Sequence, residues 1–402
     1  MTEDIATLFV TDDSGNVITD VNDEATLNPD YLAAMQAVKN AGLEIIMRNQ
    51  TETPDYFNRL RGEDILTLQE LVSGFYMCDE PSIREYGKHM TITELETIVE
   101  WFNTNGGDAF FHVNLLQSYG VAITEAGTNY IDFASYVDYY INNVLKNVNG
   151  RVSLSTDYYP LAQTTNGVNY IKEGYLSDLF LIANLSKTLK DEGYDVFSSY
   201  CIQLFKDSSA NGLALREILN VGDIRLQMNV ALALGATSFE YYPYCDISDD
   251  GSGILYDQGN VLYHENTRTF VSTVNAETAT LIDALSDFSW NGAKFVSKGT
   301  NTVSDITSSQ LESFEWLDSF SSTKDAIVSE FSGENGVFAY MAVNYVEPTA
   351  SDVNNDVTFD FGCATQALVI INGEQEIVDL TDNSYSVTLG AGESVFIYAL
   401  HK

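Results

Sequence analysis

Residues 72–82 read Val-Ser-Gly-Phe-Tyr-Met-Cys-Asp-Glu-Pro-Ser. A short apolar and aromatic run that is closed by Asp79, Glu80 and Pro81 is typical of a buried parallel strand that ends in a loop. In a barrel of alternating strands and helices, this end of each strand carries the catalytic side chains. We therefore expect Glu80 to take part in chemistry. The alternative is that Asp79 or Ser82 only caps a following turn.

Length and composition indicate a chain that can bury a large core. The chain has 402 residues, of which 45% are hydrophobic, so one large domain plus a smaller one is expected. Its 58 acidic residues outnumber its 19 basic residues and give a formal net charge of -39. Such a charge repels the phosphates of nucleic acid and the anionic face of a membrane. A neutral or cationic partner is favoured, and no nucleic-acid partner is expected.

No stretch of the sequence resembles a signal peptide or approaches the length of a membrane-spanning helix, although a leader could have been removed. We expect no membrane insertion, and the acidic surface and the second domain favour an extracellular or cell-surface setting over a cytoplasmic one. The four cysteines, Cys78, Cys201, Cys245 and Cys363, lie far apart and match no metal-ligand spacing or disulfide framework. We therefore expect free thiols, no metal and no cofactor. The oligomeric state stays open.

The first three-quarters of the chain alternates strand-like and helix-like segments. This order predicts a parallel sheet, and the number of repeats favours closure into a (β/α)8 TIM-type barrel over an open sheet. Only seven strands can be recognised, so either the first barrel strand is degenerate or missing, or another strand lies within residues 253–263. The predicted strands are residues 5–10, 43–48, the segment that ends at Glu80, and residues 109–115, 151–157, 196–203 and 236–242.

Beyond about residue 289 the hydrophobic period changes to two, which indicates strands of an antiparallel sheet. Apolar residues alternate through residues 337–343 and 385–389, and Asn372-Gly373 is a strong hairpin signal. We therefore predict an α/β barrel domain over residues 1–288 and a C-terminal antiparallel β-sandwich over residues 289–402.

Side-chain parity indicates which residues meet inside the barrel. Successive residues of a strand face opposite ways, so one set faces the helices and the other fills the interior and the active site. In the strand that ends at Glu80, alternation places Tyr76 and Cys78 on the same side as Glu80. In the next strand it places His112 and Asn114 together. The inferred inward residues at the strand ends are Glu80, Asn114, Asp157, Gln203 and Glu240.

Several polar groups at one barrel mouth indicate a polar pocket, because isolated buried polar groups are costly. Tyr158, Tyr159 and Tyr242 stand beside these groups in the sequence. Aromatic faces suit the C–H surfaces of a sugar, and amide and acid groups reach its hydroxyls. We expect a neutral carbohydrate substrate that these tyrosines help to bind. The alternative is that they are ordinary rim packing.

Hydrolysis of a glycosidic bond usually takes two carboxyl groups, one that protonates the leaving oxygen and one that acts as nucleophile or activates water. Glu80 is the expected proton donor, because neighbouring Asp79 and a partly dry pocket both raise the pKa of its carboxyl. Glu240 is the first choice for the second carboxylate. Asp157 is the second choice, and could instead orient the substrate or an arginine such as Arg48.

Three segments carry a resemblance to a known family. Residues 74–82 read Gly-Phe-Tyr-Met-Cys-Asp-Glu-Pro-Ser, residues 155–161 read Ser-Thr-Asp-Tyr-Tyr-Pro-Leu, and residues 234–244 read Leu-Gly-Ala-Thr-Ser-Phe-Glu-Tyr-Tyr-Pro-Tyr. They resemble bacterial glycoside hydrolases of clan A, in particular β-galactosidase-like barrels with a C-terminal β-sandwich. The resemblance implies a (β/α)8 barrel, retention of anomeric configuration and a glutamate acid/base, which maps onto Glu80. At Asp79 the chain departs from these enzymes, which usually carry Asn there.

The sequence therefore predicts a glycoside hydrolase that cleaves O-glycosidic bonds of poly- or oligosaccharides, with Glu80 as acid/base and Glu240 or Asp157 as nucleophile. Two other classes stay open. One is a carbohydrate-binding protein on a barrel that lacks catalysis, and the other is a metal-dependent barrel enzyme with Glu80, Asp157, His112 and Glu240 as ligands. The expected substrate-binding residues are Asp79, Asn114, Tyr158, Tyr159, Gln203, Tyr242 and Arg48.

Overall fold

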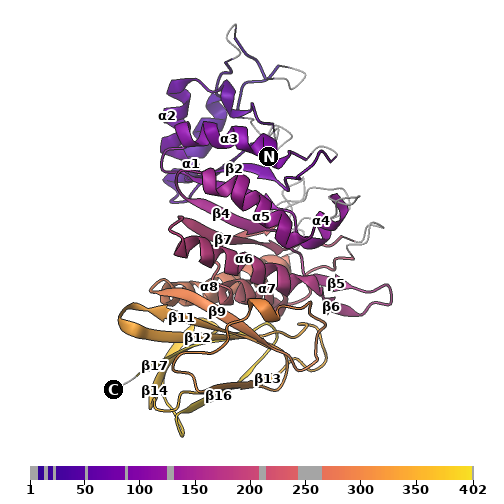
Figure 1. The fold of residues 1–402 in the computed structure, drawn as a ribbon, viewed down its shortest axis with the longest axis vertical. Helices are drawn as coiled ribbons and strands as arrows, with labels where there is room; N and C mark the ends of the chain where they lie inside the picture. Colours follow the sequence, from indigo (N-terminus) through magenta and orange to yellow (C-terminus); the bar gives the residue numbers. More distant parts are fainter. Residues whose placement is uncertain are drawn as a thin grey trace. The chain divides into compact units, whose positions relative to one another are not determined.

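Parallel strands separated by helices form the first part of the chain in the computed structural model (Figure 1). The structure describes residues 8–12, 17–20, 24–49, 53–86, 89–124, 131–207, 214–242 and 265–400. The chain divides into two units, residues 1–157 with 188–197 (unit 1) and residues 158–187 with 198–402 (unit 2). The additional strand considered within residues 253–263, like Cys245, lies outside the described residues.

A parallel sheet begins in unit 1. Strands β1 (Ile46–Arg48), β2 (Gly74–Asp79), β3 (Phe110–Leu115) and β4 (Val152–Thr156) pair in this order. The amide of Val152 donates to the carbonyl of Asp195 (2.9 Å), directly before β7 (Val196–Gln203). Strand β7 continues into unit 2, where it pairs in parallel with β8 (Ser238–Tyr242). The predicted α/β class with a parallel sheet of barrel type is confirmed, with six parallel strands in the described part of the chain.

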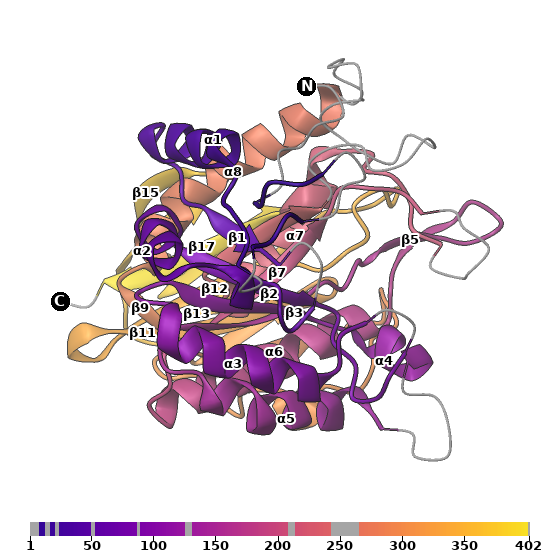
Figure 2. The same cartoon turned by 90° about the horizontal axis from the view of Figure 1, so that it is seen from above.

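Aromatic packing attaches a helix of unit 1 to one face of its sheet. Phe75 of β2 and Phe111 of β3 pack against Phe102 of α3 (Ile92–Asn105), with ring centroids 6.2 and 5.2 Å apart. Helix α3 starts at a capping box of Thr91 and Glu94 and lies beside α5 (Phe133–Asn143), as Figure 2 shows. The other helices of unit 1 are α1 (Pro29–Asn40), η1 (Phe57–Arg59), α2 (Gly62–Leu71), α4 (Ser118–Thr124) and η2 (Leu145–Asn147).

The segment before α1 differs from the prediction of a strand over residues 5–10. Its described part, from Leu8 onward, forms isolated antiparallel bridges and joins no strand of the parallel sheet. The bridges connect Phe9 to Leu27, Thr11 to Val17 and Thr19 to Ala25. Within the described residues the parallel sheet therefore begins at β1.

Unit 2 contains helices, a short hairpin and two larger antiparallel sheets. Six strands pair in the order β15-β14-β17-β12-β11-β9, and three pair in the order β10-β13-β16. The hairpin is β5 (Leu161–Gln163) with β6 (Asn169–Ile171), and the helices are α6 (Gly174–Asp191), which begins in this unit, α7 (Val221–Ala233) and α8 (Glu265–Leu285). The strands are β9 (Phe288–Val296), β10 (Ser319–Ser322), β11 (Ala326–Gly333), β12 (Val337–Asn344), β13 (Asn355–Asp360), β14 (Gln366–Ile371), β15 (Glu374–Asp379), β16 (Ser384–Leu389) and β17 (Ser394–Leu400).

Strand β12 shows why the sandwich forms. Tyr340 and Ala342 are fully buried with Phe359 of β13 in the core between the two sheets. Ala339 and Met341 face the other way and are equally buried, because α7 and α8 pack against this six-stranded sheet. A strand that is covered on both faces needs apolar residues at every position, as this segment has. The predicted antiparallel sheets after the parallel sheet are confirmed.

The predicted hairpin at Asn372-Gly373 is confirmed. It joins β14 to β15, and its residues have φ values of 51° and 81°, as a type I′ turn requires. Helix α8 ends at Leu285 and β9 begins at Phe288. The division into domains 1–288 and 289–402 stays a prediction.

Gly392 lies where the turn between β16 and β17 touches α7. Its φ is 64°, and a Cβ there would lie 2.4 Å from the carbonyl oxygen of Gly222 and 2.5 Å from the amide nitrogen of Leu226. We predict that Gly392→Ala lowers the free energy of unfolding by about 2–4 kcal/mol, since the positive φ costs about 1 kcal/mol and overpacking the rest. Gly299→Ala, at a φ of 77° with open space around it, should cost only about 1 kcal/mol. Guanidinium unfolding compares the two variants, and equal losses would contradict the prediction.

Candidate active site

A β-bulge decides which side chains of β2 meet those of β3. Tyr76 pairs with His112, and the next pair on this face is Asp79 with Asn114, so β2 advances by three residues where β3 advances by two. The extra residue reverses the alternation beyond Tyr76. The predicted common side for Tyr76 and Glu80 is therefore wrong, and Asp79 takes the place on the polar face.

Asp79 is held by three neighbours on this polar face. One oxygen of its carboxylate accepts hydrogen bonds from the hydroxyl of Tyr76 (2.8 Å) and from Nδ2 of Asn114 (3.0 Å). The other oxygen lies 3.4 Å from Nη2 of Arg48, directly at the end of β1. The guanidinium of Arg48 also lies over the ring of Tyr76, 5.1 Å from its centroid. The structure thus brings together the predicted residues Arg48, Asp79 and Asn114.

The same polar face continues onto β4. Ser153 Oγ and Nδ1 of His112 share a hydrogen bond of 2.6 Å, and Ser155 Oγ donates to Oδ1 of Asn114 (3.4 Å). The rings of Tyr76 and His112 are in contact, with centroids 4.6 Å apart. The predicted common side for His112 and Asn114 is confirmed. These buried side chains form a layer of amide, hydroxyl and imidazole groups beneath Asp79.

Asp157 follows β4 directly and is 8% exposed. Asn114 hydrogen-bonds to its carboxyl group, whereas Oδ1 has no hydrogen-bond partner among the described residues. Burial raises the pKa of Asp157 well above its ordinary value, and the negative charges of Glu80 and Asp79 raise it further. We call Asp79, Glu80 and Asp157 the acidic cluster. Asp157 therefore keeps its proton to a higher pH than an ordinary aspartate does.

Glu80 lies in a strained and anchored turn after β2. Its φ is 48°, in the left-handed region that residues with a Cβ seldom adopt. Its amide donates to the carbonyl of Asn114 (2.8 Å), and its own carbonyl accepts from Nδ1 of His89 (2.9 Å). The hydroxyl of buried Tyr136 donates to the carbonyl of Pro81 (2.6 Å). Strain that is held in place in this way is typical of functional sites. Sequence reasoning missed the two anchoring side chains, because they lie on other segments.

In unit 2 the ends of β7 and β8 carry a carboxylate and an aromatic cluster. Glu240 is half-buried and accepts a hydrogen bond from Ser199 Oγ (3.2 Å). Tyr242 is 40% exposed and stacks on Tyr159 (6.1 Å between centroids). Phe205 packs edge-on against both rings, at 5.6 and 4.8 Å. Tyr159 and Tyr242 thus contact each other and Phe205, which the sequence did not reveal, and their role in sugar binding stays a prediction.

The side chains of Gln203 and Tyr158 are buried and contact other groups of the protein. Gln203 is fully buried, its Oε1 accepts from the amide of Leu161 (2.9 Å), and its Nε2 donates to the carbonyls of Leu161, Phe205 and Arg216 (3.2, 3.1 and 3.0 Å). Tyr158 is 6% exposed and contacts another buried tyrosine ring, and burial raises the pKa of its hydroxyl. This geometry holds the backbone together and gives no support to direct substrate contact by either side chain.

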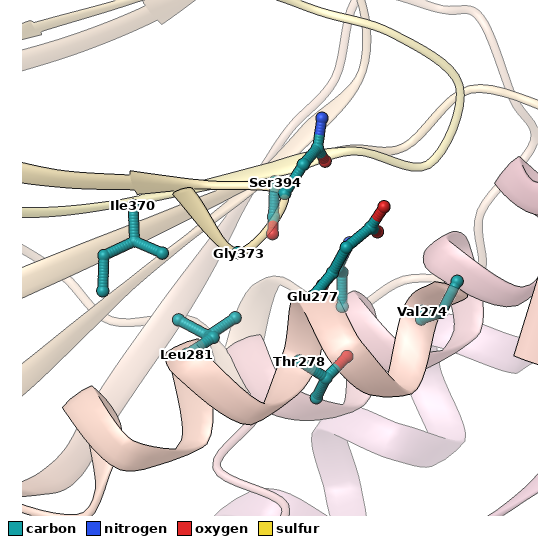
Figure 3. A pocket seen from close by; sticks show the side chains of 9 residues that line it. Val274, Glu277, Thr278, Leu281, Ile370, Gly373 and Ser394 are labelled. Carbon is teal, nitrogen blue, oxygen red and sulfur yellow. The ribbon is translucent and has the colours of Figure 1, made fainter. Parts of the chain in front are cut away.

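A small cavity in unit 2 lies where α8 meets the six-stranded sheet (Figure 3). Glu277 and Leu281 of α8 line it together with Ile370 of β14 and Ser394 of β17. Its volume of about 10 Å³ leaves room for about one water molecule. Sites for small ligands measure roughly 300–1,000 Å³, so this cavity is a packing feature.

The described part of the chain contains neither a cluster of metal ligands nor a helix that could span a membrane. Among these residues, no group of three or more His, Cys, Asp or Glu side chains is arranged to hold a metal ion. The described helices include none with the length and apolarity that crossing a membrane requires.

No protein-family profile and no curated protein sequence matches the chain. Solved structures of glycoside hydrolases align with it loosely. α-Galactosidase I from Mortierella vinacea is 11% identical over 91% of each chain, with a TM-score of 0.45. A family 27 β-L-arabinopyranosidase from Geobacillus stearothermophilus is 12% identical over 95% of this chain and 82% of its own, with a TM-score of 0.44. A family 30 endoxylanase from Clostridium papyrosolvens is 10% identical over 92% of each chain, with a TM-score of 0.37. Likeness at this level assigns neither a family nor an activity to the chain, and the resemblance to β-galactosidases stays a prediction.

The raised pKa of Asp157 makes folding stability depend on pH. Between the ordinary pKa of aspartate, about 3.9, and the raised pKa, the folded chain keeps a proton that the unfolded chain has lost. Stability therefore falls as the pH rises through this window. We predict that Asp157→Asn is more stable than the wild type by at least about 1 kcal/mol at pH 7, and that this advantage disappears near pH 4. Guanidinium unfolding at both pH values measures it, with Asp108→Asn at an exposed carboxylate as the matched control. A difference that does not change with pH would argue against the raised pKa.

The hydrogen bonds of Gln203 predict a structural role. Gln203→Leu should lower the free energy of unfolding by about 2–4 kcal/mol, because it leaves several buried backbone groups without a partner at about 1–3 kcal/mol each. Gln366→Leu, at an exposed glutamine that bonds to Asp379, should change it by less than about 0.5 kcal/mol. Guanidinium unfolding compares the two. A stable Gln203→Leu variant that loses activity would instead favour the substrate-binding role.

Proposed function

We propose that this chain is a glycoside hydrolase that cleaves O-glycosidic bonds of neutral poly- or oligosaccharides. The observation that carries the proposal is the acidic cluster, in which the pKa of buried Asp157 is raised beside Asp79 and Glu80 at the ends of parallel strands. Carboxyl groups whose surroundings drive their pKa values apart supply the acid and the base that glycoside hydrolysis needs. The amide and hydroxyl groups around them suit uncharged sugar hydroxyls, and the net charge of -39 disfavours anionic substrates.

In this proposal Glu80 is the acid/base, Glu240 is the nucleophile, and the anomeric configuration is retained. Asp157 is the weaker candidate for the nucleophile, because burial and its neighbours raise its pKa and favour the protonated carboxyl, whereas a nucleophilic carboxylate must be ionised. The raised pKa of Asp157 instead favours a protonated carboxyl next to Glu80. The role of Glu240 rests on its position at a strand end and on the hydrogen bond from Ser199. An extracellular or cell-surface setting suits a polysaccharide substrate and forms part of the proposal.

A carbohydrate-binding protein without catalysis is the second candidate. The aromatic cluster of Tyr159, Phe205 and Tyr242 favours it, because stacking of a sugar on aromatic rings needs no acid. Binding of oligosaccharides without any turnover, in the wild type as in the variants below, would identify this function.

Aryl glycosides with different leaving groups separate the roles of the two glutamates. Glu80→Gln should lower kcat/KM by about 10²–10⁴-fold for poor leaving groups, which need a proton, and far less for dinitrophenyl glycosides, which do not. Glu240→Gln should lose activity with every leaving group, because a nucleophile is needed in each case. Glu173→Gln, at an exposed glutamate, is the matched control. Equal losses across the leaving groups in Glu80→Gln would contradict its role as the acid, and full activity of Glu240→Gln would remove it as the nucleophile.

A further inference from the structure

The turn after β2, residues 80–82, changes the direction in which the side chain of Glu80 points. Successive residues of an extended strand face opposite sides of the sheet, so an extended Glu80 would face away from Asp79. Its φ is instead 48°, and a left-handed residue interrupts the alternation of a strand. Besides burial, the negative charge of Glu80 raises the pKa of Asp157, which directly follows β4. The left-handed conformation therefore allows Glu80 to belong to the acidic cluster.

Backbone hydrogen bonds hold the turn at both its ends. The amide of Glu80 donates to the carbonyl of Asn114 (2.8 Å). Ser82 is fully buried. Its amide donates to the carbonyl of Met90 (2.9 Å), and its carbonyl accepts from the amide of Ile92 (2.8 Å). The first and the last residue of the turn are thus fixed to neighbouring segments of unit 1.

Two side chains bind the remaining carbonyls of the turn. Nδ1 of His89 lies 2.9 Å from the carbonyl oxygen of Glu80, and because a carbonyl can only accept, Nδ1 carries the proton. The hydroxyl of Tyr136 donates to the carbonyl of Pro81 (2.6 Å) and accepts from the amide of Leu116 (3.3 Å), which directly follows β3. With these two contacts, every backbone donor and acceptor of the turn has a partner.

The two side chains bind the peptide groups that follow the Cα atom of Glu80, and so they oppose rotation of the turn. Without them, a residue with a Cβ would favour a negative φ. We propose that His89 and Tyr136 are positioning residues that hold the Glu80 carboxyl in the acidic cluster. Their effect on catalysis rests on the proposed function, in which Glu80 is the acid/base.

Helix α5 supplies both the positioning tyrosine and a matched control. Tyr136 is fully buried, and its hydroxyl joins the turn to the segment after β3. Tyr140 lies one helical turn further along α5 and is equally buried. Its hydroxyl has no hydrogen-bond partner among the described residues. Tyr140→Phe and Tyr136→Phe therefore remove the same group from the same helix, but only Tyr136→Phe removes a hydrogen bond to the turn.

Infrared titration of the Asp157 carboxyl tests the proposal in the full chain without any turnover. Its C=O band, isolated by difference against Asp157→Asn, disappears as Asp157 ionises, and Glu80→Gln should lower this midpoint by removing a neighbouring charge. We expect Tyr136→Phe and His89→Ala to lower the midpoint by at least about half a pH unit, because the Glu80 carboxylate moves away. Tyr140→Phe should leave the midpoint unchanged, and His89→Asn, whose amide replaces the Nδ1 donor, should restore most of it.

The same substitutions in a Glu80→Gln background separate positioning from a general structural role. If His89 and Tyr136 act through Glu80, their loss should shift the midpoint no further once the charge at position 80 is gone. A structural role that keeps water out of the site would instead lower the midpoint equally in both backgrounds. That outcome, an unchanged midpoint in Tyr136→Phe and His89→Ala, or an unchanged midpoint in Glu80→Gln would each overturn the proposal.

Kinetic measurements connect the positioning to the proposed function. With aryl glycosides that have poor leaving groups, Tyr136→Phe should lower kcat about tenfold or more and change KM little, because a displaced acid still lets the substrate bind. The loss should be smaller with dinitrophenyl glycosides, as for Glu80→Gln. A wild-type chain that hydrolyses no glycoside would overturn the proposed function, whereas the infrared titration decides the positioning in either case.

Discussion

The hydrogen bond from Asn114 to Asp79 determines how the strand ends of unit 1 meet. It exists because β2 contains one residue more than β3 opposite it, which turns Asp79 toward Tyr76 and the polar face. The same shift carries Glu80 beyond the strand, into a left-handed conformation that backbone hydrogen bonds hold. The chemistry proposed for this site starts from that placement.

Electrostatics then distributes the protons of the acidic cluster. Three carboxyl groups this close cannot all ionise cheaply. Arg48 compensates Asp79 at the exposed side, whereas Asp157 is deeply buried and receives a hydrogen bond from an uncharged amide. Burial therefore favours the protonated form of Asp157. A carboxyl group with a raised pKa thus lies beside half-buried Glu80, the proposed acid/base.

Local patterns predicted much of this fold. Alternation and turn chemistry were enough for the parallel sheet, the antiparallel sheets and the Asn372-Gly373 hairpin, because each depends on residues near in sequence. Strand-end position predicted that Glu80 and Asp157 lie near each other, and both belong to the acidic cluster. The predicted alternation of side chains was wrong beyond Tyr76, because one extra residue in β2 reverses it. The amino-acid sequence of the strand does not reveal such a bulge. Gln203 is buried among backbone groups of residues that are distant in sequence, such as Leu161 and Arg216. Hydrophobic periodicity cannot predict such contacts.

The proposed chemistry depends most on the raised pKa of Asp157 beside two other carboxyl groups. Infrared difference spectroscopy detects the C=O stretch of a protonated carboxyl directly, apart from the bands of carboxylates. We expect the band of Asp157 to persist in the wild-type chain well above the ordinary pKa of aspartate, about 3.9, and to be lost in Asp157→Asn. A wild-type spectrum without the band, or a band that survives in Asp157→Asn, would contradict it.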